Sequence, residues 1–291
     1  MKAVSFYIPK TQSEVFGVQE DRLPHFYPNL HVHTELQVTL IEAGTGTLMT
    51  GDYLGRFSEG EVYVIGKEVP HVFRSDDTYF APENTAAVHG ITVFFDESYA
   101  GTRFWETAEL REAQAWIKAS AGGFAVQGHT RERCQALLRQ IRHETGIPKV
   151  QTGLSLIHAL STSAELVQLS VEQEGGLLKE MLSERMNRVL RFTFEESSRP
   201  ISIEEVAELA SLTPPAFCRY FKKRTRKSYV RFLNEIRISH ACRLLLSTEI
   251  PIGTIGLEIG FNTLSHFNEV FREIKGTTPR TYRQQRGVGV S

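Results

Sequence analysis

Residues 251–283 read PIGTIGLEIGFNTLSHFNEVFREIKGTTPRTYR, which predicts a helix, a tight turn and a second helix within about thirty residues. Apolar or small residues occupy the i, i+3, i+4 and i+7 positions of one face of the first helix. These positions are Ile252, Ile255, Gly256 and Ile259. Gly260 permits the turn. The second helix is expected from Thr263 to Ile274, with one buried stripe along it. That stripe comprises Phe267, Val270, Phe271 and Ile274.

The opposite face of the second helix carries mostly groups that can donate to or accept from a base edge in a DNA major groove. Its residues are Leu264, Ser265, Asn268 and Glu269, with His266 beside them. Gly276 fits a helix C-cap, and Pro279 marks where the chain turns. The stretch therefore predicts a helix-turn-helix whose second helix reads DNA.

The same pattern occurs once earlier in the chain, as an internal repeat. Its first helix places Ile203, Val206, Ala207 and Ala210 49 residues before the equivalent positions of the second copy. Thr213 suits the N-cap of the next helix and Pro214 its first turn. This helix is expected to run to about Arg224, burying Phe217 and Phe221. Its outward residues are Pro215, Cys218, Arg219 and Lys222, and it ends in the basic run Lys222, Lys223, Arg224, Arg226 and Lys227.

The segment between the two copies, residues 229–247, has apolar residues at helical spacing and predicts one long connecting helix. About eighteen residues at roughly 1.5 Å each span about 27 Å. That length can hold two reading helices near the ~34 Å that separates successive major grooves on one DNA face.

These motifs resemble the AraC/XylS family of bacterial transcription regulators, over residues 182–286. The family's elements appear as Ile255-Gly256, Gly260-Phe261, Phe267 to Arg272, Gly276 to Pro279 and Tyr282-Arg283. Two positions depart from the pattern. Gly256 stands where the family usually has alanine, and Arg226 replaces a glycine common after the first basic run.

The resemblance implies which side chains meet DNA. The base-contacting positions are Pro215, Cys218 and Arg219 in the first reading helix and Leu264, Ser265, His266, Asn268 and Glu269 in the second. The phosphate-contacting positions are Thr213, Lys222, Lys223 and Arg272. It also implies a homodimer that contacts RNA polymerase and activates transcription rather than repressing it.

Charge is distributed unevenly along the 291 residues, which are enough for two domains. Residues 182–291 hold 18 Lys and Arg against 11 Asp and Glu, a net +7, whereas residues 1–181 have a net charge of −8. A basic domain joined to an acidic one is expected when only one of them touches phosphate. The three isolated cysteines suggest neither disulfides nor a zinc site, and no signal peptide or long apolar run appears, so a cytoplasmic protein is expected.

The first half of the chain predicts a β-sandwich or barrel. From Leu30 to about Phe95, short apolar runs alternate with glycine turns. Because side chains alternate along a strand, one face should carry four polar groups, with a further histidine at the end of a later strand. These residues are His31, His33, Glu35 and Gln37, followed by His71, and we expect them to line an effector pocket.

The strands and histidines resemble cupins, small β-barrels in which such histidines can hold a metal. Here Gln37 occupies the glutamate position of that element, and Ser75 stands where an asparagine is usual. Three imidazoles suffice for an open metal site. The sequence favours the alternative that these histidines line a sensory cavity or form hydrogen bonds within the barrel wall, so no metal or other cofactor is expected.

The sequence as a whole predicts a multidomain protein, with an all-β cupin-like barrel and flanking helices followed by an all-α tandem helix-turn-helix domain. The expected domains are residues 1–170 and 177–291, with the linker VEQEGG at 171–176 and helix-turn-helix motifs at about 203–224 and 252–274. Helices are expected at 102–120, 131–144, 154–169 and 177–194. The leading hypothesis is a DNA-binding regulator controlled by a small-molecule effector, and not an enzyme. The alternative is a metal-dependent cupin enzyme fused to a DNA-binding domain.

Overall fold

The computed structural model describes residues 14–81, 84–96, 101–170 and 184–284. The chain divides into two compact units, residues 1–182 and 183–291, and each is described by itself. The expected linker at 171–176 and the first part of the helix expected at 177–194 lie outside the described residues.

The N-terminal unit is rich in β-structure and contains two antiparallel sheets. The six-stranded sheet has the order β1-β7-β2-β5-β8-β9, and the three-stranded sheet has the order β4-β3-β6. The strands are β1 (Phe16–Leu23), β2 (Leu36–Ala43), β3 (Gly46–Thr50), β4 (Tyr53–Phe57), β5 (Val62–Ile65), β6 (His71–Ser75), β7 (Val88–Phe95), β8 (Phe124–Val126) and β9 (Leu166–Gln168). Within the described part of the unit, the strand pairing does not close into a ring, so the cupin-like barrel stays a prediction.

The helices of this unit differ in part from those expected. They are α1 (Thr102–Trp105), α2 (Arg111–Ala119), α3 (Gly128–Ile141) and α4 (Gly146–Ser161), with 3-10 turns at η1 (Asp77–Phe80), η3 (Ala108–Leu110) and η4 (Ser120–Gly122). The helix expected at 102–120 is interrupted at Thr107, which is extended and whose hydroxyl donates to Phe104 O. The helix expected at 154–169 ends at Ser161, because the Ser161 and Thr162 hydroxyls bond to His158 O and the chain then pairs as β9.

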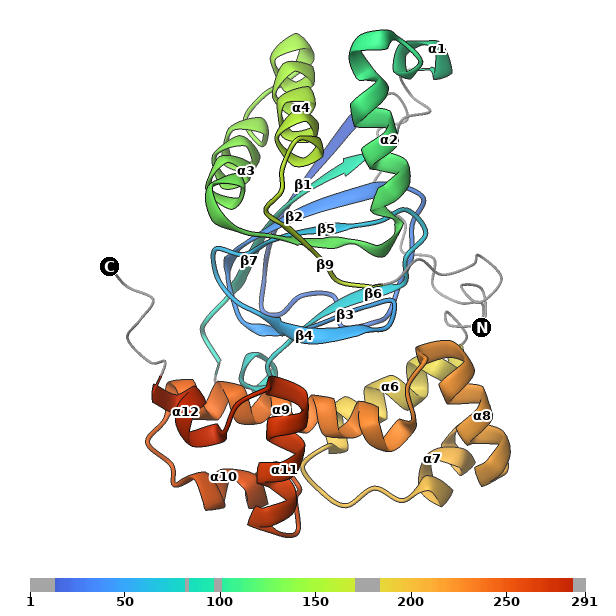
Figure 1. Ribbon diagram of the computed structural model, residues 1–291, viewed down its shortest axis with the longest axis vertical. Helices are drawn as coiled ribbons and strands as arrows, with labels where there is room; N and C mark the ends of the chain where they lie inside the picture. Colours follow the sequence, from blue (N-terminus) through green and yellow to red (C-terminus); the bar gives the residue numbers. More distant parts are fainter. Residues whose placement is uncertain (1–13, 82–83, 97–100, 171–183, 285–291) are drawn as a thin grey trace. The chain divides into compact units, whose positions relative to one another are not determined.

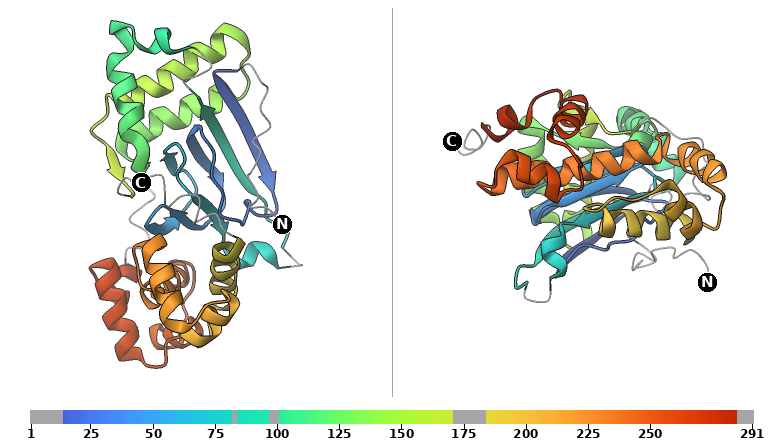
Figure 2. Two further views of the ribbon diagram at one scale, coloured as in Figure 1. Left: turned by 90° about the vertical axis from the view of Figure 1, so that its right-hand side faces the viewer. Right: turned by 90° about the horizontal axis from the view of Figure 1, so that it is seen from below.

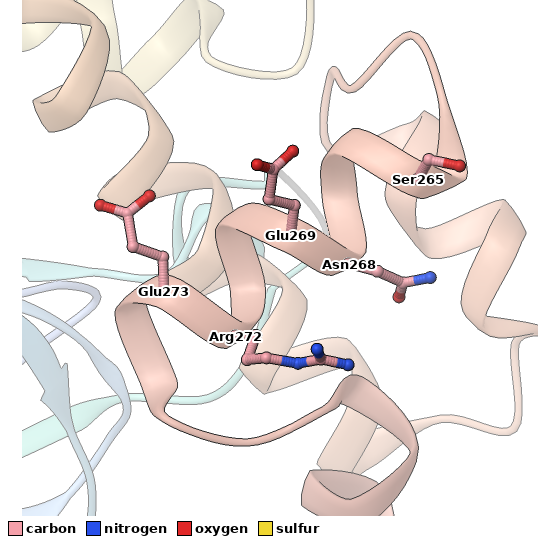
Figure 3. Close-up of a pocket in the computed structure, with 5 residues that line it drawn as sticks. All are labelled: Ser265, Asn268, Glu269, Arg272 and Glu273. Carbon is pink, nitrogen blue, oxygen red and sulfur yellow. The ribbon is translucent and has the colours of Figure 1, made fainter.

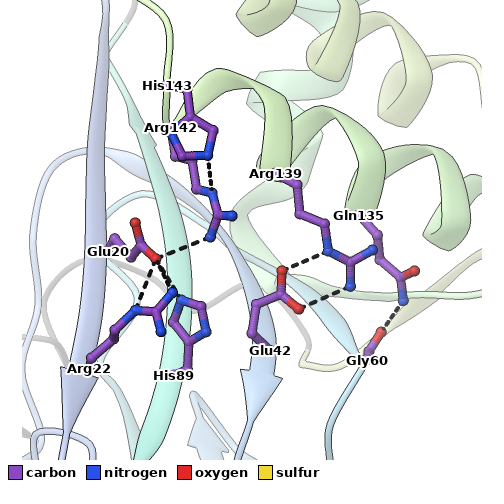
Figure 4. A network of polar contacts seen from close by, with 9 residues as sticks. All are labelled: Glu20, Arg22, Glu42, Gly60, His89, Gln135, Arg139, Arg142 and His143. Carbon is purple, nitrogen blue, oxygen red and sulfur yellow. Dashed lines mark hydrogen bonds and ion pairs between the residues drawn. The ribbon is translucent and has the colours of Figure 1, made fainter.

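Helices α2, α3 and α4 pack against the six-stranded sheet (Figure 1) and complete its core. The residues at the centre of this core include Leu36, Val38, Val64, Val93, Trp105, Leu138 and Leu160. Ion pairs from the last turn of α3 and from Arg142, the residue that follows it, join this segment to the strands (Figure 4). Arg142 donates to Glu20 on β1 at 3.1 Å, and Arg139 forms two hydrogen bonds with Glu42 on β2.

The C-terminal unit is entirely helical in its described part. Its helices are α6 (Glu184–Glu196), α7 (Ile203–Leu209), α8 (Pro214–Thr225), α9 (Tyr229–Ser247), α10 (Ile252–Glu258), α11 (Leu264–Lys275) and α12 (Pro279–Gln284). Both predicted helix-turn-helix motifs and the long helix between them are present, as α7–α8, α10–α11 and α9. No described helix is long and apolar enough to cross a membrane.

Helix α9 (orange in Figure 2) belongs to the cores of both helix-turn-helix motifs. Toward its N-terminus, Tyr229 and Phe232 stack edge-on with Phe221 of α8. Toward its C-terminus, α9 packs on α10 and α11 through a second cluster, which includes Ile238, Ala241, Leu245, Ile255, Phe267 and Phe271. Since a different part of α9 is buried in each core, the helix fixes the two motifs relative to each other.

The two copies of the motif share a backbone that bends into the left-handed region at the same two places. In the second copy, glycines occupy both positions, with φ of 96° at Gly260 and 67° at Gly276. In the first copy, the equivalents are Ser211, with φ of 53°, and Arg226, with φ of 56°. A side chain disfavours this conformation, so the first copy carries backbone strain that the second avoids.

Candidate functional site

Helix α8 exposes the side chains that the repeat predicted to face outward. Phe217 and Phe221 are fully buried beneath it. Thr213, Pro215, Cys218, Arg219, Lys222 and Lys223 are all exposed. Thr213 is extended, as an N-cap residue should be, but its side chain makes no capping bond. Prolines at the first two helical positions lack N–H groups, which removes one of the donors that such a cap usually bonds.

Helix α11 presents its polar face around an open hollow (Figure 3), whose lining residues are Ser265, Asn268, Glu269, Arg272 and Glu273. Asn268 and Arg272 extend from one side of the helix, and Glu269 and Glu273 from another. Leu264 is 47% exposed. The His266 ring lies against Phe261, with 5.4 Å between centroids. The Thr263 hydroxyl accepts a hydrogen bond from the His266 N–H and so caps the helix.

Arg231 on α9 is a residue that the sequence analysis did not single out. Its guanidinium forms ion pairs with Glu235 on its own helix and with Glu273 on α11. Lys227 binds the same Glu235 at 2.6 Å. The spacing of Arg231 and Glu235 was the available signal, because oppositely charged residues four apart meet on a helix surface. The chain of charges anchors one carboxylate of α11 to α9.

In the N-terminal unit, the structure brings four of the five predicted pocket residues into one cluster. Ligand atoms of His31, His33 and His71 lie within 4.8 Å of one another. Gln37 Oε1 is 2.8 Å from His33 Nε2 and 2.9 Å from His71 Nε2. The fifth residue, Glu35, is 4% exposed, and its Oε2 lies 3.7 Å from His33 Nδ1.

The second ring nitrogen of each histidine faces a backbone carbonyl. The Nδ1 of His31 is 3.0 Å from Asn29 O, that of His33 is 3.0 Å from Glu35 O, and that of His71 is 2.8 Å from Val69 O. Burial lowers the pKa of His31 to about 4 and holds the pKa of His71 well below its usual value. Both of these rings are therefore neutral at physiological pH.

Comparison with known proteins bears on the C-terminal unit first. Residues 206–285 match the sequence model of a helix-turn-helix domain family. This stretch includes α8, α9, α10 and α11.

Relatives extend the likeness to most of the chain. It is 23% identical over 278 residues to the HTH-type transcriptional activator RhaS of Klebsiella pneumoniae, which covers 92% of this chain and 91% of that protein. It is 27% identical over 143 residues to an uncharacterized HTH-type transcriptional regulator of Haemophilus influenzae, about half the length of each chain. The C-terminal domain of AraT, a response regulator from Geobacillus stearothermophilus, is 31% identical over 36% of this chain and 87% of that structure, with a TM-score of 0.34.

Proposed function

We propose that this chain, an AraC-type transcriptional regulator with a DNA-binding helix-turn-helix domain, binds a promoter through α8 and α11 and activates transcription under the control of a small-molecule effector. The observation that carries the proposal is the pair of reading helices held by α9. The nineteen residues of α9 span about 28 Å, a length that suits the placement of α8 and α11 in two successive major grooves on one face of DNA.

The exposed side chains of α8 and α11 divide into those suited to bases and those suited to phosphates. Arg219 has a planar fork that matches guanine O6 and N7, Asn268 matches adenine N6 and N7, and Glu269 can accept from cytosine N4. Ser265, His266 and Leu264 complete the base-reading face of α11, beside Pro215 and Cys218 on α8. Lys222, Lys223, Arg272 and Thr213 are proposed to contact phosphates.

The charges on α11 favour discrimination between DNA sequences over tight, non-specific binding to any DNA. Glu269 and Glu273 bring negative charge to the DNA-reading helix, where phosphates repel it. Arg231 neutralises Glu273 through their ion pair, whereas Glu269 stays at the open hollow. A carboxylate there is tolerated only where a base edge supplies a donor, so α11 is expected to reject most sequences.

The N-terminal unit is proposed to supply effector binding and a homodimer contact, in a cupin-like domain, so that two DNA-binding units engage one promoter and recruit RNA polymerase. The alternative, a metal-dependent enzyme fused to a DNA-binding domain, is less favoured because a relative aligned over most of the chain is named a transcriptional activator.

The test of DNA recognition is binding of the purified chain to a selected operator and to all its single-base variants. Arg219→Ala should relax discrimination at one base position by roughly 1 to 3 kcal/mol. Lys222→Ala should weaken binding to every variant alike and lower the salt slope by about one unit. Arg111→Ala, on an exposed position of α2, is the matched control and should change neither quantity. Uniform weakening by Arg219→Ala would assign it to a phosphate instead.

A further inference from the structure

Arg237, near the middle of α9, is a buried cation whose charge is met by backbone carbonyls. It is 8% exposed, and within the described residues it forms no ion pair with an acidic side chain. Its Nε donates to Ser197 O at 2.8 Å, and its Nη2 donates to Arg199 O at 2.7 Å. Burying a charge costs free energy that hydrogen bonds only offset, and an apolar side chain of similar size is often more stable in such a place. What this arginine positions therefore explains it better than stability does.

The two carbonyls belong to the α6–α7 connection, residues 197–202. Helix α6 ends at Glu196, and carbonyls at the end of a helix have no partner inside it. A guanidinium satisfies such carbonyls by hydrogen bonding and is favoured by the negative end of the helix dipole. The side chain of Arg199 also binds both carboxylate oxygens of Glu205 on α7. Arg237 therefore attaches α9 to the segment that leads into the first helix-turn-helix motif.

The same guanidinium contacts the turn of the second motif. Its central carbon lies 5.6 Å from the centre of the Phe261 ring, within the range of a cation–π contact. A Cβ built at the preceding residue, Gly260, would lie 3.0 Å from Arg237 Nε and Nη2 and 2.8 Å from Ser197 O. Gly260 is therefore needed for this close approach as well as for its left-handed backbone. Three segments meet at Arg237: the α6–α7 connection, α9, and the turn between α10 and α11.

Phe261 connects this junction to α11. The centre of its ring lies 5.4 Å from that of His266, with the two rings edge to face, and 5.5 Å from that of the fully buried Phe267. His266 is in the first turn of α11, beside the face proposed to read bases. The guanidinium of Arg237 restricts how the Phe261 ring can turn, and that ring in turn restricts His266. The contacts therefore run without a gap from the α6–α7 connection to a side chain proposed to meet DNA.

We propose that Arg237 is a positioning residue for DNA reading, which holds the turn of the second motif against the α6–α7 connection and, through Phe261, orients His266 and the first turn of α11. This role rests on the proposed function, since it concerns base contacts by α11. Lysine is not equivalent here, because one ammonium on a flexible stem does not span two carbonyls and a ring face as a planar guanidinium does. Hydrogen bonds to base edges depend steeply on distance and angle, so a small displacement of α11 reduces discrimination between bases before it unfolds the unit.

Arg237→Lys keeps the charge and removes the planar fork, so it tests positioning apart from electrostatics. The affinity of the full-length protein is measured for a selected operator and all its single-base variants. His266→Ala identifies the base positions that depend on His266, and Arg219→Ala identifies those that depend on α8. At the His266-dependent positions Arg237→Lys should reduce discrimination roughly tenfold, and at the α8-dependent positions discrimination should stay within about twofold of the wild type. Arg191→Lys, at an exposed position of α6, is the matched control and should change neither.

A loss of stability alone would give a different result. A destabilised protein has a smaller folded fraction, which lowers its affinity for every operator variant by the same factor and leaves discrimination between bases unchanged. The double variant Arg237→Lys with His266→Ala adds a further test. Discrimination at the His266-dependent positions should fall no further than in His266→Ala alone, because the two side chains act through one series of contacts.

Phe261→Leu keeps the proposal testable if helical circular dichroism shows that Arg237→Lys fails to fold. It leaves both hydrogen bonds from Arg237 to the carbonyls in place and removes the ring between Arg237 and His266, so it should relax the same base positions. Uniform weakening, or unchanged discrimination at the His266-dependent positions, in either folded variant would overturn the proposal. The proposed function would survive that result, because the effect of Arg219→Ala would stand. A wild-type protein that bound no operator would overturn both.

Discussion

Arg226→Gly should stabilise the C-terminal unit, and Gly276→Arg should destabilise it. The two positions are equivalent in the repeated motif, and both have left-handed backbone, with φ of 56° and 67°. Nothing lies within 4 Å of a Cβ built at Gly276, so a side chain there would meet no steric obstacle. The reciprocal exchange therefore measures backbone strain and not packing.

The expected magnitude follows from two opposing contributions. Left-handed backbone costs a residue with a side chain roughly 1 to 2 kcal/mol, and glycine loses about 0.5 to 1 kcal/mol more conformational freedom on folding. Arg226→Gly should therefore raise the free energy of unfolding by about 0.5 to 1 kcal/mol. For a unit of this size that corresponds to about 2 to 8 °C in Tm. Gly276→Arg should lower Tm by a similar amount.

The assay is thermal unfolding of the full chain, followed by helical circular dichroism. Trp105 and Trp116, the two tryptophans of the chain, lie in the N-terminal unit, so their fluorescence reports that unit alone and should not change. Ser211→Gly, at the other left-handed position of the first copy, should add a comparable increment. If Arg226→Gly left Tm unchanged while Gly276→Arg lowered it, the strain assigned to Arg226 would be refuted.

Three further outcomes are expected. Cys218 is exposed, whereas Cys134 and Cys242 are buried, and burial raises the pKa of Cys134 to about 12. A maleimide should therefore label Cys218 first, and operator DNA should protect Cys218 from the reagent. If mass spectrometry showed the same labelling with and without DNA, Cys218 would not belong to the DNA interface. The fragment 177–291 should bind DNA in a mobility-shift assay, though more weakly than the full chain. A folded fragment that stays unbound at low salt would contradict the proposal that the C-terminal unit binds DNA by itself. Gly153→Ala should destabilise the N-terminal unit by about 1 to 3 kcal/mol, because the new Cβ would lie 2.5 Å from the Phe16 ring. Gly253→Ala should not destabilise the C-terminal unit, because its Cβ would lie 3.9 Å from the Leu264 side chain. Tryptophan fluorescence follows unfolding of the N-terminal unit, and helical circular dichroism follows the C-terminal unit.

The C-terminal unit was predictable because each of its helices carries a strong local signal. The apolar stripe of Phe267, Val270 and Phe271 repeats with the period of a helix, and the turn glycine and C-cap are visible in the sequence. The sequence showed that Gly256 stands where the AraC/XylS pattern usually has alanine, but it did not show why a glycine is needed there. A Cβ there would lie 3.0 Å from the Phe267 ring, a contact between two helices that no local pattern contains.

The N-terminal unit was predictable for its longer strands and not for its edges. Strands β8 and β9 have three residues each, too few for an alternating pattern. They form because β5 offers a partner to β8, and β8 in turn pairs with β9. His31, His33 and Glu35 were expected to share one strand face with Gln37, but β2 begins only at Leu36, so these three residues lie before the strand. Gln37 on β2 contacts both His33, which precedes that strand, and His71, the first residue of β6. This arrangement depends on tertiary structure, because His71 lies 34 residues after Gln37 in the chain.

The burial of α9 in two cores constrains how this protein can evolve. Each residue inserted into a helix rotates everything beyond it by about 100° and moves it by about 1.5 Å. In the proposed mode of DNA binding, an insertion in α9 would turn α8 or α11 away from the DNA face that the other helix contacts. Operators recognised by descendants of this protein should therefore keep their half-site spacing, and new promoters should be acquired through substitutions on the exposed faces of α8 and α11.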